Sequence, residues 1–130
     1  MIDLSGAYLH DVDLSEFNLP KTSFAYVSLA GAHLKRANMK DATFTNADLT
    51  GSKLMGARLD RTNLAGAQLN EAILLRASLV KADLSGANLD NAVLRNVDMT
   101  DAVLDGASMK EIEYDGRTSW PQGYDPDEMR

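Results

Sequence analysis

The fold of this protein is decided by the stretch Ala82-Asp83-Leu84-Ser85-Gly86-Ala87-Asn88-Leu89-Asp90-Asn91, which is one five-residue phrase written twice. The phrase can be moved along the chain from residue 2 to residue 116 without losing register, which gives 23 consecutive pentads. Position i, marked by Leu84, is Leu in 17 pentads and Phe, Met or Tyr in the other six. Position i−2 is Ala in 14 pentads and is never charged. Each pentad therefore carries two uncharged positions with one residue between them.

A period of five excludes a helix as the repeating element. On a helix at about 100° per residue, each pentad would rotate the pattern by about 140°, so apolar side chains would cover the whole surface. A coiled coil needs a period of 3.5 and fails in the same way. In an extended segment, i−2 and i point to the same side, but five is odd, so the chain must turn a corner between pentads to keep that side inward.

The glycines support a corner in every pentad. Eight of the nine glycines fall at position i+2, where a corner needs a residue that tolerates an unusual φ. Short extended sides joined by regular corners coil into a solenoid whose turns stack as a β-ladder, about 4.8 Å apart. The interior pattern alone leaves the number of sides per turn open.

The phrase Ala-(Asp/Asn)-Leu-x-x resembles the pentapeptide-repeat family, and the match covers 115 of the 130 residues. This resemblance implies an all-β fold, a right-handed quadrilateral β-helix with four pentads per coil. Twenty-three pentads then make about six coils. We expect residues 1–116 to form the β-helix and residues 117–130 to form a C-terminal capping tail.

The tail resembles an ending found in many proteins of that family, Tyr-Asp-x-x-Thr-x-Trp-Pro-x-Gly-aromatic-Asp-Pro. We expect Tyr114, Trp120 and Tyr124 to form a cap over the last coil, covering apolar surface and unpaired backbone. The bulky i−2 residues cluster at the two ends and are expected to plug the tube: Ile2, Val12, Phe17 and Val27 at the N-terminal end, and Val97 and Ile112 at the other.

Composition indicates one small domain with no catalytic apparatus. The chain has no cysteine and no apolar run long enough to span a membrane, so we expect a cytoplasmic protein that does not contact membranes. His10 and His33 fall on different sides of the rod, and no phosphate loop, nucleophile elbow or zinc spacing is present. We therefore expect no enzyme activity, catalytic residue, metal site or cofactor.

Several polar residues have a structural interpretation. Asp or Asn recurs at i−1, where its side chain can bond backbone at the corner. Thr22, Ser52 and Thr62 occupy i−2, and we expect their hydroxyls to point inward and bond the backbone.

One side of the rod departs from the repeat by exposing apolar residues among basic ones. We call it face three; it consists of the pentads whose position i is Leu14, Leu34, Leu54, Leu74, Leu94 and Tyr114. Its middle coils carry Lys and Arg, including Lys35 and Arg36, and no acid. A stacked apolar cluster with a basic rim is typical of a contact surface. The predicted partner-binding residues are Lys53, Met55, Ile73, Leu75, Arg76, Val93 and Arg95.

These observations favour a non-catalytic interaction or scaffold module that presents a rigid surface to a protein partner and does not bind nucleic acid directly. The alternative is a DNA mimic, because the resemblance extends to family members that bind DNA gyrase in place of duplex DNA. In that reading Asp48, Glu71 and Asp90 on an acidic side would imitate phosphates. Self-association through the N-terminal coil is a further expectation, since its strand edges lack neighbours.

Overall fold

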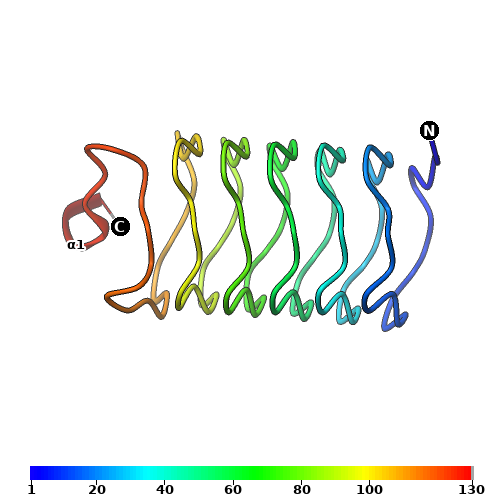
Figure 1. Cartoon of the computed structure of the whole chain (residues 1–130), viewed down its shortest axis with the longest axis horizontal. Helices are drawn as coiled ribbons and strands as arrows, with labels where there is room; N and C mark the ends of the chain where they lie inside the picture. Colours follow the sequence, from blue (N-terminus) through cyan, green and yellow to red (C-terminus); the bar gives the residue numbers. More distant parts are fainter. Residues whose placement is uncertain (130) are drawn as a thin grey trace.

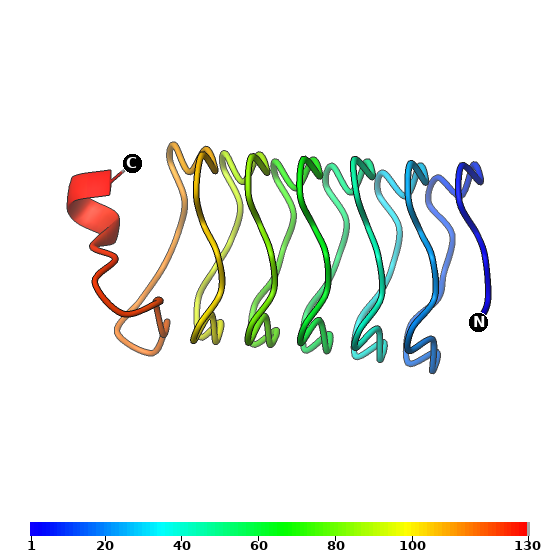
Figure 2. The same cartoon turned by 90° about the horizontal axis from the view of Figure 1, so that it is seen from above.

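The chain forms a rod of stacked coils, which the computed structural model describes for residues 1–129 (Figure 1). Parallel β-bridges join residues that occupy the same place in consecutive coils, from Asp3 with Ser23 at the N-terminal end to Val93 with Glu113 near the other end. Each of these bridges spans four pentads, so each coil has four sides. This register confirms the quadrilateral β-helix, and the view from above shows the same stack from a second direction (Figure 2).

Between the first coil and the last, each pentad pairs its backbone with both neighbouring coils. Around Leu54, the Leu54 N–H donates to the Ile73 carbonyl at 2.7 Å and the Gly56 N–H donates to the Leu75 carbonyl at 2.9 Å, both in the next coil. The Lys53 N–H donates to a carbonyl of the preceding coil at 2.9 Å. The sides are single bridges, so within residues 1–129 the only longer regular element is the helix α1, Pro126–Met129, of four residues.

The inside of the tube is filled by the apolar positions i and i−2. From Leu19 to Met99, every residue at position i is buried. The rings of Phe24 and Phe44, one coil apart, stack with their centroids 4.6 Å apart and 6° between their planes. Small residues at i−2, mostly Ala, fill the space beside them. The predicted inward set is therefore the core, and inward-facing charge is excluded because the tube offers it no partner.

The corners impose a left-handed backbone on residues of every kind. Position i+2 has a positive φ in every pentad from Gly6 to Glu111, and 15 of these residues are not glycine. Asn and Asp tolerate this conformation, whereas a residue such as Tyr26 (φ 58°) or Lys81 (φ 61°) adopts it at a cost of roughly 1 kcal/mol. Glycine is thus favoured at the corners, but the ladder enforces the conformation whichever residue is present.

The inward hydroxyls divide into satisfied and unsatisfied groups. Thr62 donates its hydroxyl to the Leu59 carbonyl at 2.7 Å, and Thr22 makes a long contact of 3.5 Å with the Pro20 carbonyl. Ser52 Oγ is buried and has no hydrogen-bond partner. The expectation of a backbone bond is therefore wrong for Ser52, although its hydroxyl is attached to Cβ as that of Thr62 is.

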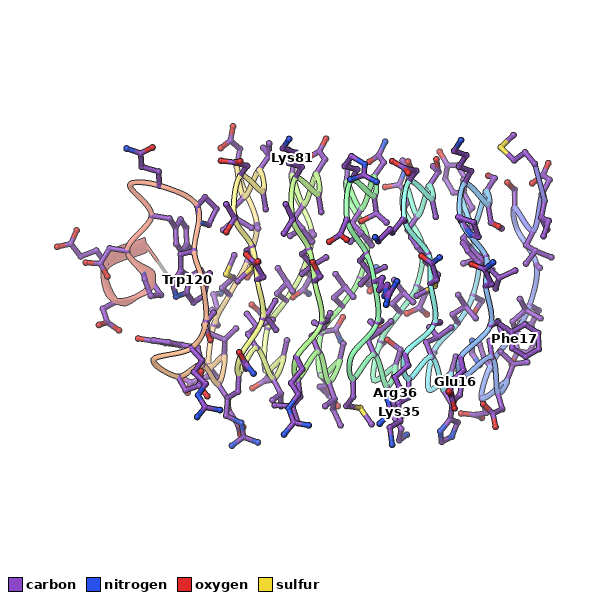
Figure 3. All side chains as sticks on the ribbon, in the orientation of Figure 1. Glu16, Phe17, Lys35, Arg36, Lys81 and Trp120 are labelled. Carbon is purple, nitrogen blue, oxygen red and sulfur yellow. The ribbon has the colours of Figure 1, made fainter. Side chains whose placement is uncertain are left out.

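The C-terminal tail first adds one more bridge to the ladder and then folds over the end of the rod. Asp98 pairs with Ser119, whereas the spacing of all the earlier bridges would select Thr118, so the tail has gained one residue relative to the repeat. This shift puts Trp120 at the inward position above Met99, where Figure 3 shows it pointing into the end of the rod. Tyr114 meets the Trp120 ring edge-on with centroids 5.6 Å apart, and Tyr124 stacks on it at 5.2 Å. The three aromatic residues together cover the last coil.

The N-terminal end is open. Ile2 and Phe17 are 50% and 51% exposed, because no coil in the described chain lies beyond them. The expected role as plugs is therefore wrong for these two residues, which border the opening, and Figure 3 shows Phe17 at this end of the rod. Val27, Val97 and Ile112 of the same set are buried, as expected. Self-association through this coil stays a prediction.

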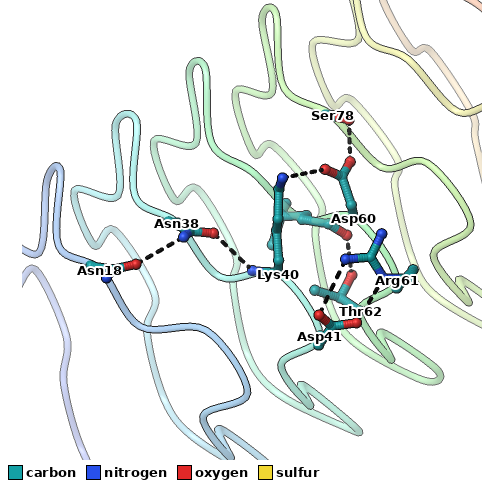
Figure 4. A network of polar contacts seen from close by, with 9 residues as sticks. Asn18, Asn38, Lys40, Asp41, Asp60, Arg61, Thr62 and Ser78 are labelled. Carbon is teal, nitrogen blue, oxygen red and sulfur yellow. Dashed lines mark hydrogen bonds and ion pairs between the residues drawn. The ribbon is translucent and has the colours of Figure 1, made fainter.

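Polar side chains on the outside also repeat every coil, and this places interacting groups above one another (Figure 4). Asn38 donates its side-chain amide to Asn18 Oδ1 at 2.8 Å. Arg61 donates from Nε to Asp41 Oδ1 at 2.8 Å and from Nη2 to Asp41 Oδ2 at 3.2 Å, a two-pronged pair between corner residues of consecutive coils. This hydrogen bond lowers the pKa of Asp41 below its usual value.

Removing the buried hydroxyl of Ser52 should stabilise the protein. We expect Ser52→Ala to raise the free energy of unfolding by about 1 kcal/mol, because a buried hydroxyl without a partner is lost. Thr62→Val is the matched control: it also removes one hydroxyl but breaks a hydrogen bond, so it should lower stability by a similar amount. Urea unfolding of the three proteins measures both changes, and a loss of stability in Ser52→Ala would contradict this packing.

Acid should weaken the rod below about pH 3.8. Hydrogen bonds lower the pKa of Asp3, Asp13, Asp41 and Asp90 in the folded chain from the usual value of 3.8. Folding therefore favours the ionised form, so this contribution is present above pH 3.8 and is lost as the pH falls through the lowered values. We expect the urea midpoint to be flat above pH 5 and to fall below pH 3.8.

The control for this acid effect is Asp90→Asn. Asp90 accepts hydrogen bonds from Ser108 Oγ at 2.6 Å and from the Lys110 N–H at 2.9 Å. An amide oxygen in its place cannot titrate, so the variant should lose less stability between pH 5 and pH 2 than the wild type. Equal losses would mean that Asp90 titrates normally in the folded chain.

Candidate interaction surface

The first column of face three is built by the ladder itself. Consecutive β-bridges join His33 to Lys53, Lys53 to Ile73, Ile73 to Val93 and Val93 to Glu113. These i−1 side chains therefore stand above one another on the outside of the rod, roughly 5 Å apart. Ile73 and Val93 are half-buried, because their neighbours in the column cover their flanks. The predicted apolar column exists and is less exposed than isolated side chains would be.

A second column runs along the same face at position i+1. It contains Lys35, Met55, Leu75 and Arg95, and both Met55 and Leu75 are half-buried. At its C-terminal end, Arg95 Nη1 lies 3.9 Å from Glu113 Oε2, with about half of each side chain exposed. An ion pair this open contributes little to stability, so Arg95 stays available to a partner.

The corner beyond this column contains a notch. Glu16, Arg36, Gly56, Arg76 and Asn96 succeed one another at position i+2, and the missing side chain of Gly56 leaves a hollow between the two arginines. The hollow has a volume of about 140 Å³. We call it the Gly56 notch; it is lined by Lys35, Arg36, Met55, Gly56, Leu75 and Arg76.

The notch is positively charged and its cations are not neutralised from within the chain. In the part of the chain that the structure describes, no carboxylate lies within 4.0 Å of the charged groups of Lys35, Arg36 or Arg76. Figure 3 shows Lys35 and Arg36 projecting from the rod at this corner, with Glu16 on the coil before them. The surface therefore combines free positive charge with half-buried apolar side chains.

The acidic residues of the alternative reading do not form a comparable group. Asp48 accepts a hydrogen bond from the Thr50 N–H at 3.0 Å, and Asp90 binds Ser108 and Lys110. These carboxylates hold the backbone at corners, and both are half-buried. Glu71, at a corner position, is exposed. The three residues belong to three different columns: the Glu71 N–H donates to the Asp90 carbonyl of the next coil at 2.9 Å, whereas Asp48 pairs with Ser28 and Gln68.

The rest of the described surface offers little other chemistry. Residues 1–129 contain no group of three or more His, Cys, Asp or Glu side chains that could hold a metal ion. A crevice of about 670 Å³ separates the last coil from the tail, lined by residues 102–107 and 121–124, with Asp105 as its one charged side chain. Asp105 has no base or nucleophile beside it there. Among the described residues, no helix has the length and apolarity to cross a membrane.

The predicted site and the observed surface overlap in part. The structure brings Lys53, Ile73 and Val93 into one column and places Met55, Leu75 and Arg76 in the notch. The predicted set omits Lys35, Arg36 and Gly56. The signal for them is the one-coil spacing of Arg36, Gly56 and Arg76, which is visible in the sequence once four pentads per coil are known.

Comparison with known proteins agrees with the observed fold. The similar solved structures include a pentapeptide repeat protein from the thylakoid lumen of Arabidopsis thaliana, which is 28% identical, with a TM-score of 0.74 over 75% of this chain and 68% of that one. They also include the pentapeptide repeat protein Rfr23 from the cyanobacterium Cyanothece 51142, which is 31% identical, with a TM-score of 0.53 over 87% of this chain and 90% of that one. A search of curated proteins gave no match. The model of pentapeptide repeats matches residues 2–41, 37–76 and 77–112 in eight copies. The chain therefore belongs to the pentapeptide-repeat family and has its right-handed quadrilateral β-helix.

Proposed function

We propose that this protein is a non-catalytic interaction module that docks a protein partner on face three. The observation that supports this most is the unneutralised positive charge of Lys35, Arg36 and Arg76 beside the half-buried apolar residues Met55 and Leu75. Interfaces commonly combine an apolar centre with a polar rim in which Arg is enriched. The chain carries a net charge of −6, so this face differs in sign from the molecule as a whole.

The β-helix suits such a role because each of its middle coils is held in place by the coils before and after it. Consecutive coils are hydrogen-bonded to each other, and the inward residues at position i are buried from Leu19 to Met99. A surface of this kind loses little conformational entropy when it binds, which favours affinity. The hollow described in the middle coils is too shallow to enclose a substrate, and this supports binding rather than catalysis.

The DNA-mimic alternative has less support. A DNA mimic needs carboxylates that are exposed to the partner as the phosphates of DNA are. Asp48 and Asp90 instead accept hydrogen bonds from the chain's own backbone N–H groups. The free cations of face three would also repel the positively charged groups with which a DNA-binding protein receives its duplex.

A double substitution on face three should abolish partner binding and preserve the fold. We expect Ile73→Asp with Leu75→Asp to lose the proteins that the wild type retains from an extract of the host, because two charges replace the apolar centre of the surface. The matched control is Asn63→Asp with Ala65→Asp, which changes the same two positions on another face of the same coil. Affinity capture with mass spectrometry compares the three proteins, and circular dichroism checks their folding.

Two results would contradict the proposal. One is retention of the same proteins by both double variants. The other is inhibition of gyrase supercoiling by the wild type at low micromolar concentration that survives the face-three substitutions, since this would favour the DNA-mimic alternative. Under the interaction-module proposal we expect no inhibition of supercoiling.

A further inference from the structure

The Gly56 notch is the size of one amino-acid side chain. Its volume of about 140 Å³ equals that of roughly four or five water molecules at about 30 Å³ each. Pockets for cofactors and drug-sized ligands begin at about 300 Å³. The notch is therefore too small for a nucleotide or a similar cofactor, and it matches a single protruding group.

Its walls indicate which group fits. Lys35, Arg36 and Arg76 supply positive charge, and Arg36 and Arg76 lie two coils apart, roughly 10 Å, on either side of Gly56. The stem of Arg36 reaches over the glycine, since a Cβ placed on Gly56 would lie 3.4 Å from Arg36 Cγ. Met55 and Leu75 form the apolar part of the lining. This combination fits an anion that is attached to an apolar neighbour.

A carboxylate bound by an arginine already occurs at an equivalent corner of the rod. At the next corner, Asp41 stands one coil before Arg61, and its carboxylate accepts two hydrogen bonds from that guanidinium. Gly56 stands one coil before Arg76 in the same corner geometry, with φ +67° against 61° at Asp41. Arg76 thus faces a position from which the carboxylate is missing. A carboxylate supplied from outside would occupy the place that Asp41 fills for Arg61.

From this geometry we propose that the Gly56 notch binds an aspartate or glutamate side chain of a partner protein, while an adjacent apolar side chain of the same segment packs on Met55 and Leu75. The inference rests on the proposed docking of a partner on face three, to which it adds the chemistry that the partner must present. A planar carboxylate matches the fork of an arginine side chain in two-pronged hydrogen bonding, and this favours Asp or Glu in an acidic peptide segment over other anions.

The direct test uses a defined peptide pair and nitrogen-15-labelled protein. The probe is acetyl-Gly-Leu-Asp-Leu-Gly-amide, and its partner has Asn in place of Asp. We expect the Asp peptide to shift backbone amide signals of the six notch residues, with a Kd on the order of 1 mM. The Asn peptide should bind about tenfold more weakly, because the charge-assisted hydrogen bonds are lost. Raising the NaCl concentration from about 50 mM to about 500 mM should weaken binding of the Asp peptide several-fold.

Two substitutions test the location of the site. Gly56→Asp places a carboxylate of the chain's own in the notch, as Asp41 does at the next corner, and should abolish binding of the Asp peptide. Asp is tolerated at these corners, as Asp11 and Asp101 show with φ of 58° and 61°. Gly51→Asp is the control, with the same φ region and open space around its Cβ, and should leave binding unchanged.

A second pair tests the charge. Arg76→Gln should lower the affinity for the Asp peptide about tenfold. Lys81→Gln removes a positive charge from a corner on another side of the rod and should leave this affinity unchanged (Figure 3). Thermal melts of all four variants establish that each is folded before binding is measured.

Each remaining result has a defined meaning. Equal binding of the Asn peptide, unchanged binding in Gly56→Asp, or no shift at the notch in the wild type would overturn the proposal. Inorganic phosphate that produces the same shifts at lower concentration than the peptide would also overturn it, in favour of a general anion site. If Ile73→Asp with Leu75→Asp loses host partners while Gly56→Asp keeps them, the face-three function stands and the notch proposal fails.

Discussion

The structure depends on one constraint: every side of the rod must be hydrogen-bonded to the sides directly before and after it in the stack. The N–H of Leu54 reaches the Ile73 carbonyl in the next coil and the N–H of Lys53 reaches the Ala32 carbonyl in the previous one, and equivalent bonds recur around each coil. An insertion of a single residue within the repeat would move inward side chains outward and break this pairing. The unbroken pentad register from residue 2 to residue 116 follows from that requirement.

The same constraint explains the strained corners. The chain must change direction after each short side, and the left-handed conformation at i+2 is adopted by Glu, Lys, Arg and Tyr as well as by Gly. Such residues favour other conformations by roughly 1 kcal/mol or more, so the ladder and the buried core must outweigh this cost at many positions. Conformational preference therefore influences which residues occur at the corners, while the ladder decides their backbone.

Stacking also organises the outer surface into columns in which residues one coil apart are neighbours. This arrangement builds structural pairs such as Asp41 with Arg61 and Asn18 with Asn38. It equally builds the notch, where a glycine stands in a column between Arg36 and Arg76. A binding site on such a rod is thus formed by side chains that stack in columns along it, and not by loops that converge on a pocket. Position in the ladder also decides the role of the tail, since a single added residue brings Trp120 into the inward column at the end of the stack.

The sequence by itself determined the period, the inward residues and the coiled architecture, because side-chain polarity at i−2 and i leaves no other regular backbone. It also indicated the residues of the cap and the apolar column of Ile73 and Val93, since both follow from position within the repeat. Only the tertiary structure decided the unsatisfied hydroxyl of Ser52 and the open flanks of Ile2 and Phe17, because these depend on which atoms a neighbouring coil provides. The notch belongs to the same class: Gly56 is a permissive corner residue in the sequence, and it becomes a hollow only when the coils place an arginine above and below it.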